Sequence, residues 1–153
     1  MDVVDTKEFA GYLNMKNLKD LPRPFLKWAG SKKQLLTPIK EKMNFALDKY
    51  HYNVLVDGFL GSGAVTFMMI NEFGDRVEEI LANDCNADLV NCFKVVKKNI
   101  KGLISRLKLL EAEFRNTKFG EEFYKKVRAE FNDRVACRAS VDRAANFIFL
   151  NHT

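Results

Sequence analysis

The sequence predicts an α/β protein that begins with a strand–helix–strand unit and continues as a mainly helical region. Two short apolar runs, residues 53–57 and 80–84, have the length and the β-branched residues of strands. Between them lie a glycine-rich loop, residues 58–63, and an apolar segment of helical length, residues 64–73. After Asp84 the apolar residues recur at three- and four-residue spacing, which is typical of helices.

Composition limits the class of protein. The chain has 153 residues, 47% of them apolar, and 13 phenylalanines, which is too apolar for a disordered chain. No apolar run approaches the roughly 20 residues that span a membrane. The acidic start, Met1–Asp5, differs from a secretory signal. Three cysteines without C-x-x-C spacing predict neither a disulfide framework nor a zinc site, which favours a reducing cytoplasm.

The segment before the first strand is expected to contain a loop and then a helix. Residues 1–21 are weakly patterned, with at most a short helix near Lys7–Tyr12, and form an N-terminal extension. Pro22 and Pro24 favour an extended lead-in to an irregular loop around Trp28. The helix after this loop has apolar residues on one face: Leu35, Leu36, Ile39, Met43, Ala46 and Leu47.

The strand–helix–strand unit comes next. Residues 53–57 form a nearly continuous apolar run, so this strand is expected to be buried on both faces. The helix is expected from Ala64 to Phe73, with Gly74 at its end, and the second strand from Ile80 to Asp84. No third strand is predicted. Because a two-stranded parallel sheet is marginal alone, either a helical region covers its edges or further strands lie outside this chain.

Four helices are expected after the second strand, over residues 88–100, 102–114, 120–132 and 139–150. The first two contain a basic stretch without an acidic residue between Asp88 and Glu111. Four of its lysines are expected to share one helix face: Lys94, Lys97, Lys98 and Lys101. This face is either a solvated surface or a surface that contacts nucleic-acid phosphates.

The glycine-rich loop after the first strand is the strongest sign of a binding site. Glycines let the backbone turn tightly and approach a ligand closely, and the next helix presents free N–H groups. Asp84 ends the second strand about 20 residues after Gly63, which is typical of a carboxylate that binds ribose hydroxyls. This combination favours a nucleoside-containing cofactor over a plain strand-to-helix turn.

Other candidate residues favour structural roles when composition alone is considered. The loop around Trp28 combines the only tryptophan with three lysines, which is also typical of a solvated helix start with a tryptophan over the core. Cys85, beside Asp84, is interpreted as a core residue rather than a nucleophile. His51 and His152 have no partner at ligand spacing, so no metal site is predicted.

Five segments, in order, resemble the N-terminal half of the Dam-type DNA adenine-N6 methyltransferases. The first three read FLKWAGSK (25–32), DGFLGSG (57–63) and NDCNADLVN (83–91). The fourth, FYKKVRAEFN (123–132), resembles the family's FYxxxRxxFN, and the fifth, RAANFIFLNHT (143–153), resembles its RAARFIYLNxT. The resemblance runs from about Pro24 to Thr153 and favours a binding role for the tryptophan loop.

The resemblance implies a partial Rossmann-like fold of S-adenosylmethionine-dependent methyltransferases. The cofactor-binding part would cover residues 22–91, and an incomplete, mainly helical target-recognition part residues 92–153. S-adenosylmethionine would be bound by Trp28, Lys32, Phe59, Gly61, Gly63 and Asp84. In this arrangement Trp28 lies against the methionine part, Lys32 points towards its carboxylate, and Asp84 takes the ribose hydroxyls. Duplex DNA would be contacted by Lys94, Lys98, Lys101 and His152.

The sequence also departs from the family. Gly58 stands where the family usually has proline, and Ser31 where it usually has a second glycine. The catalytic Asp-Pro-Pro-Tyr motif, which in the family orients the adenine amine and stacks on the flipped base, does not occur, so no catalytic residue is assigned. The resemblance therefore implies an enzyme truncated before this motif and inactive alone, unless a second polypeptide supplies the missing half.

The alternative is a catalytically inactive module that binds S-adenosylmethionine or DNA and acts as a regulator or decoy. A different nucleotide-binding Rossmann protein is disfavoured, because it would leave the tryptophan loop unexplained.

Overall fold

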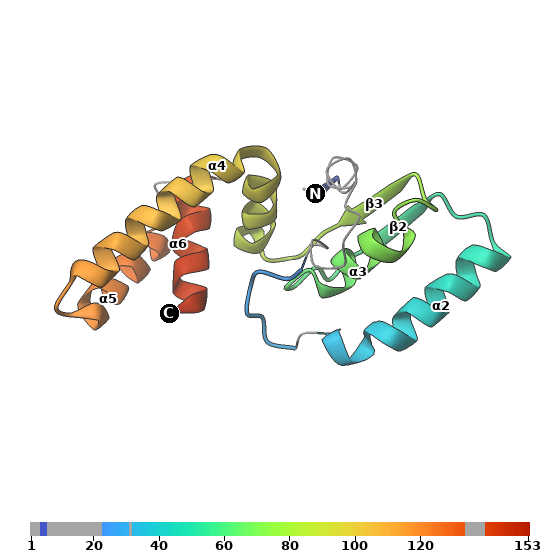
Figure 1. Ribbon diagram of the computed structural model, residues 1–153, viewed down its shortest axis with the longest axis horizontal. Coiled ribbons are helices and arrows are strands. Elements are labelled where there is room, and N and C mark those ends of the chain that lie inside the picture. The colour runs from blue at the N-terminus through green and yellow to red at the C-terminus, as the bar shows by residue number, and fades with distance from the viewer. Residues whose placement is uncertain (1–3, 6–22, 31, 134–139) are drawn as a thin grey trace. The chain divides into compact units, whose positions relative to one another are not determined.

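A computed structural model describes residues 4–5, 23–30, 32–133 and 140–153 (Figure 1). The chain divides into two compact units, Met1–Cys85 and Asn86–Thr153. The first holds the sheet and the glycine-rich loop, and the second is helical. The short helix considered near Lys7–Tyr12 lies outside the described residues, and the domain boundaries at residues 21 and 91 stay predictions.

The sheet of the first unit has the strand order β1-β3-β2. β2 (Val54–Asp57) and β3 (Glu79–Ala82) pair in parallel, as the sequence predicts. β1 (Val4–Asp5) pairs antiparallel with the other side of β3, so the prediction of no third strand is wrong. Two residues are too few to show a periodic pattern, and this pairing depends on backbone hydrogen bonds to a distant strand. Within the described residues, β2 is an edge strand.

β2 is buried on one face only. Leu55 and Asp57 are buried, whereas Val54 is 42% exposed and Val56 is 62% exposed. The prediction that both faces are buried is therefore wrong. The covered face lies against the helix α3 (Ala64–Phe73), which contacts both parallel strands and is itself almost entirely buried. Burial of the other face depends on what covers the sheet, which the strand's own sequence does not encode.

Both helices predicted for the first unit are present. A 3₁₀ turn, η2 (Lys32–Leu35), leads into α2 (Leu36–Lys49). The predicted apolar face is only partly buried: Leu47 of α2 is buried, whereas Leu35, at the end of η2, is 54% exposed. α3 has the predicted bounds, and Gly74 directly follows its last residue. No helix among the described residues is long and apolar enough to cross a membrane.

The second unit consists of α4 (Ala87–Asn116), α5 (Gly120–Asn132) and α6 (Val141–His152). α4 contains one non-helical residue, Asn99, with φ −149° and ψ 55°. The two helices that the sequence predicts are therefore present, with the break at Asn99. The Asn99 side-chain oxygen accepts the backbone N–H of Gly102 at 3.1 Å, and a Cβ at Gly102 would lie 2.8 Å from this side chain. A side chain at Gly102 would therefore require the Asn99 amide to move.

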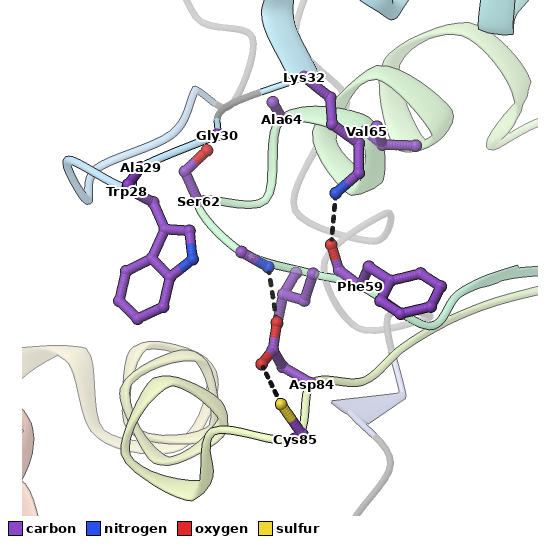
Figure 2. A pocket seen from close by; sticks show the side chains of 12 residues that line it. Trp28, Ala29, Gly30, Lys32, Phe59, Ser62, Ala64, Val65, Asp84 and Cys85 are labelled. Atoms are coloured by element: carbon purple, nitrogen blue, oxygen red, sulfur yellow. Dashed lines mark hydrogen bonds between the residues drawn. The ribbon is translucent and has the colours of Figure 1, made fainter.

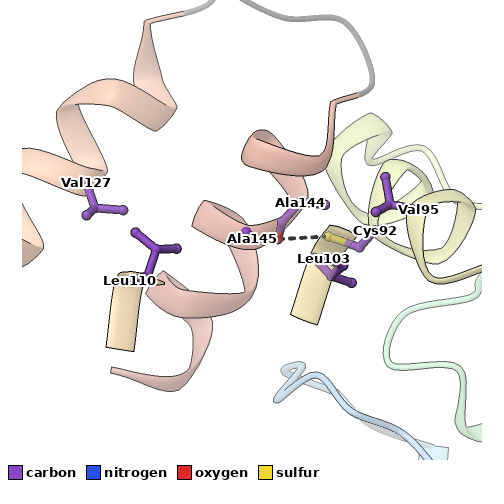
Figure 3. Close-up of a cluster of buried hydrophobic side chains, with 7 residues drawn as sticks. All are labelled: Cys92, Val95, Leu103, Leu110, Val127, Ala144 and Ala145. Atoms are coloured by element: carbon purple, nitrogen blue, oxygen red, sulfur yellow. Dashed lines mark hydrogen bonds between the residues drawn. The ribbon is translucent and has the colours of Figure 1, made fainter. Parts of the chain in front are cut away.

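α4, α5 and α6 share one hydrophobic core (Figure 3). Its buried members are Cys92, Val95, Leu103, Leu110, Val127, Ala144 and Ala145. The Cys92 thiol lies 3.7 Å from the carbonyl oxygen of Ala144. Burial, and to a lesser degree the charge of Asp88, raises the pKa of this thiol from 9.0 to about 12. Cys92 is therefore a protonated core residue.

Arg143 ties the three helices together. Two of its guanidinium N–H groups donate to the carboxylate of Asp88, in the first turn of α4. A third donates to the backbone carbonyl of Phe131 at 3.0 Å, and the guanidinium lies 4.4 Å from the centre of the Phe131 ring. Both residues of the ion pair are mostly buried, so this contact fixes α4, α5 and α6 relative to one another.

Candidate functional site

A pocket in the first unit lies beside the loop that follows β2, residues 58–63 (Figure 2). Five of the predicted cofactor-binding residues line it: Trp28, Lys32, Phe59, Gly61 and Asp84. The sixth, Gly63, is the residue directly before α3 and does not line the pocket. The structure thus brings together residues from the tryptophan loop, the glycine-rich loop and the segment after β3.

Asp84 joins two of these segments. Its Oδ2 accepts the backbone N–H of Gly61 at 3.0 Å, and its Oδ1 lies 3.6 Å from the thiol of Cys85 (Figure 2). A carboxylate can accept about four hydrogen bonds through its two oxygens. Asp84 therefore holds the glycine-rich loop and can still accept hydrogen bonds from the hydroxyls of a ligand.

Lys32 and Phe59 form another part of the pocket wall. The Lys32 ammonium donates to the backbone carbonyl of Phe59 at 3.0 Å and lies 6.0 Å from the centre of its ring (Figure 2). The Phe59 side chain is 77% exposed. An ammonium has three donors, so the contact with Phe59 leaves donors for an anionic group of a ligand.

Glycine is required at two positions of the loop. Gly61 has φ 50° and Gly63 has φ 82°, which is the left-handed region that other residues avoid. A Cβ at Gly61 would also lie 3.2 Å from Cδ1 of Trp28, which is tighter than most side-chain contacts. The absence of a side chain at Gly61 thus lets the indole approach the loop backbone.

Cys85 lines the pocket, contrary to the sequence-based interpretation. The structure shows it exposed, so its interpretation as a core residue is wrong. Its position directly after Asp84, beyond the end of β3, could have indicated this, because the residues that follow parallel strands face the ligand end of a sheet.

The residues predicted to contact DNA lie in the helical unit. Lys98 and Lys101 are exposed, Lys94 is partly buried, and His152 is exposed at the end of α6. Asn99 interrupts α4 between Lys98 and Lys101, so the single helix face expected for the lysines does not continue through Lys101.

Arg106, which belongs to the same basic stretch, forms an ion pair with Asp142 at 2.7 Å, so its charge is neutralised locally. In the described ranges, no group of three or more His, Cys, Asp or Glu side chains could hold a metal ion.

Comparison with known proteins assigns the family. The chain matches the D12 class N6 adenine-specific DNA methyltransferase family over residues 28–153. It is 38% identical over 133 residues to the Type II methyltransferase M.MjaIII of Methanocaldococcus jannaschii, an alignment that covers 86% of this chain and 45% of that protein. It is 36% identical over 130 residues to a DNA adenine methylase of Haemophilus influenzae, with 84% and 40% covered.

A third relative, the Type II methyltransferase M1.LlaDCHI of Lactococcus lactis subsp. cremoris, is 33% identical over 129 residues, with 84% of this chain and 40% of that protein covered. The chain therefore spans less than half the length of these relatives. The family match includes all the residues that line the pocket and the whole helical unit. The chain thus belongs to the D12 class N6 adenine-specific DNA methyltransferase family.

Proposed function

We propose that this chain is the S-adenosylmethionine-binding and helical portion of a DNA adenine-N6 methyltransferase, and that the pocket beside the 58–63 loop holds the cofactor. One observation carries the proposal. The pocket gathers Trp28, Lys32, Phe59, Gly61 and Asp84 where β2 and β3 end. Ligands of open α/β sheets bind beyond these carboxyl ends of the strands.

The residues of the pocket fit S-adenosylmethionine. The aromatic rings of Trp28 and Phe59 attract a cationic sulfonium. The Lys32 ammonium can pair with the carboxylate of the methionine part, and Asp84 can accept hydrogen bonds from the ribose hydroxyls. A Cβ at Gly61 would crowd the indole, so the wall suits a ligand that approaches the backbone closely. When bound, the cofactor supplies the methyl group.

We further propose that the sheet is the start of a Rossmann-like methyltransferase fold and is completed beyond β2. Parallel sheets are almost always covered on both faces, yet Val54 and Val56 are exposed and β2 is an edge among the described strands. A strand from a further polypeptide could pair with this edge. It would also carry the Asp-Pro-Pro-Tyr motif, which these 153 residues lack.

Duplex DNA is the proposed substrate. The exposed Lys98 and Lys101, together with Lys94 and His152, are proposed to contact its phosphates, which gives affinity that depends on salt and not on sequence. A DNA-modifying role and the absence of paired-cysteine motifs support a location in the reducing cytoplasm.

Two assays on the wild-type chain test the proposal. Calorimetric titration should show saturable binding of S-adenosylmethionine, and lack of binding would contradict the cofactor site. Transfer of a radiolabelled methyl group to adenine in duplex DNA should occur only when a polypeptide with the Asp-Pro-Pro-Tyr motif is added. Methyl transfer by the 153 residues alone would show that the motif is not needed. Tight DNA binding without methyl transfer in the presence of that polypeptide would favour a regulator or decoy.

A further inference from the structure

Asp57 does not line the pocket, but its carboxylate contacts two segments beside it. One oxygen accepts a hydrogen bond from the 58–63 loop, which lines the pocket, and the other accepts one from α3, which follows that loop. Asp57 is the last residue of β2 and is 7% exposed. Its Oδ1 accepts the backbone N–H of Phe59 at 3.1 Å, and its Oδ2 accepts the hydroxyl of Thr66 at 2.7 Å. Thr66 is buried in the first turn of α3. One buried carboxylate thus contacts the beginning of the 58–63 loop and the helix that follows it.

The groups of the loop that contact other pocket residues lie between these two attachments. The carbonyl of Phe59 accepts from Lys32, and the N–H of Gly61 donates to Asp84. In the other backbone hydrogen bonds of the loop, the Leu60 N–H donates to the carbonyl of Asn83, the Gly63 N–H donates to the carbonyl of Leu60, and the Gly63 carbonyl accepts from the N–H of Phe67. None of these replaces the hydrogen bond that Asp57 accepts from the Phe59 N–H, so the orientation of that peptide depends on Asp57.

We infer that Asp57 and Thr66 form a buried clamp that sets the conformation of the 58–63 loop, and that Asp57 is a positioning residue for the ligand pocket. Hydrogen bonds to a carboxylate are stronger than those between neutral groups. Thr66 supplies the only donor to Oδ2 among the hydrogen bonds of Asp57 described above. Valine in its place would leave a buried oxygen without this donor, and the carboxylate could then turn away from Phe59.

The expected change in ligand affinity rests on the proposed function, whereas the hydrogen bonds of the clamp do not. Thr66→Val should weaken binding of S-adenosylmethionine on the order of tenfold, the size of losing a hydrogen bond to a charged group. Thr66→Ser keeps the hydroxyl and should restore the affinity. Trp28, the only tryptophan, lines the pocket and provides the fluorescence signal for the titration. Thr37→Val, at an exposed threonine of α2, is the matched control.

A destabilised variant separates positioning from general loss of stability. Leu47→Ala removes a buried side chain of α2 that does not line the pocket. It should lower the melting temperature while leaving the affinity unchanged, whereas Thr66→Val should lower the affinity. Wild-type affinity in Thr66→Val, or failure of Thr66→Ser to restore it, would overturn the inference.

A measurement without ligand distinguishes failure of the clamp from failure of the proposed function. Hydrogen exchange of the Phe59 amide, followed by NMR, should be faster in Thr66→Val than in wild type and near wild type in Thr66→Ser. Unchanged exchange would overturn the clamp even if the ligand binds. If the wild-type chain does not bind S-adenosylmethionine, the proposed function fails, and the exchange result alone decides for or against the clamp.

Discussion

The backbone N–H of Gly61 donates to Oδ2 of Asp84 at 3.0 Å, which joins two loops that are separated by 23 residues in the chain. The contact places a carboxylate against the turn whose backbone lines the pocket. Asp84 therefore has two roles in the proposed site: it holds the glycine-rich loop and presents acceptor lone pairs to a ligand. Ligand affinity should be sensitive to both residues.

Removal of the Asp84 carboxylate should weaken the binding of S-adenosylmethionine to the pocket. Asp84→Ala is expected to lower the affinity for S-adenosylmethionine by about tenfold or more, because the variant has neither the ribose acceptor nor the hydrogen bond to Gly61. Calorimetric titration measures the change. Asp75→Ala, at an exposed acid outside the pocket, should bind like wild type. Equal affinities for the two variants would contradict the role of Asp84.

Glycine substitutions in one loop should differ in effect. Gly61→Ala places a Cβ 3.2 Å from Trp28 at a left-handed φ of 50° and should cost about 1–2 kcal/mol of stability. It should also change the tryptophan fluorescence and weaken ligand binding. A Cβ at Gly58 meets no atom within 4 Å, so Gly58→Ala is the matched control. Similar losses of stability and ligand affinity in both variants would show that a less flexible loop, rather than the contact with Trp28, causes these losses.

The Cys92 thiol predicts a pH dependence of stability. Its pKa is about 12 in the folded protein and 9.0 ordinarily, so the unfolded chain loses this proton first as pH rises. The thiol's contribution to stability should be constant below about pH 9 and then fall as pH rises towards 12. The stability difference between wild type and Cys92→Ala, from urea unfolding, should therefore shrink above about pH 9. A difference that does not change with pH would contradict the burial of Cys92, and Cys85→Ala is the exposed control.

Loss of the Arg143 side chain should destabilise the helical unit. Arg143→Ala leaves the mostly buried carboxylate of Asp88 without its partner and is expected to cost about 2–4 kcal/mol. Arg115→Ala removes an exposed ion pair with Glu111 and should cost about 0.5 kcal/mol or less. Urea denaturation followed by circular dichroism measures both. A comparable small cost for both would show that the Arg143 contacts are not structural.

The proposed DNA contacts predict a change in salt dependence. Replacing Lys98 and Lys101 by glutamine should reduce the slope of log affinity against log salt by about 0.9 for each phosphate that the variant no longer neutralises. Fluorescence anisotropy with a labelled duplex, over a series of salt concentrations, measures the slope. Lys118→Gln, at another exposed lysine of the helical unit, should leave it unchanged. A slope that falls equally in the control would indicate only a general effect of net charge.

Local patterns predicted the elements that carry their own signals. α3 and α5 have the predicted bounds, because helical spacing is clear in both and a glycine stands at one end of each. β1 carries no such signal, since its two residues pair with a strand far along the chain. The exposure of one face of β2 could not be predicted either. An apolar strand has the same sequence pattern whether or not another element covers its second face.

The site was predictable in part for a similar reason. Glycines and an acid after successive strands pointed to Gly61 and Asp84 through their spacing alone. Trp28 and Lys32 were assigned only by family resemblance, because composition favoured a solvated loop. The contact between Asp57 and Thr66 follows no sequence period. It arises because β2 and the first turn of α3 come together in the fold.

The most direct test of the proposed cofactor site is an NMR titration of the isotopically labelled chain with S-adenosylmethionine. The proposal predicts saturable shifts of the amide signals of Gly61, Ser62 and Asp84 and of the Trp28 indole N–H, because these residues line the pocket. Absence of shifts at these residues at millimolar ligand, or shifts confined to residues outside the pocket, would contradict it.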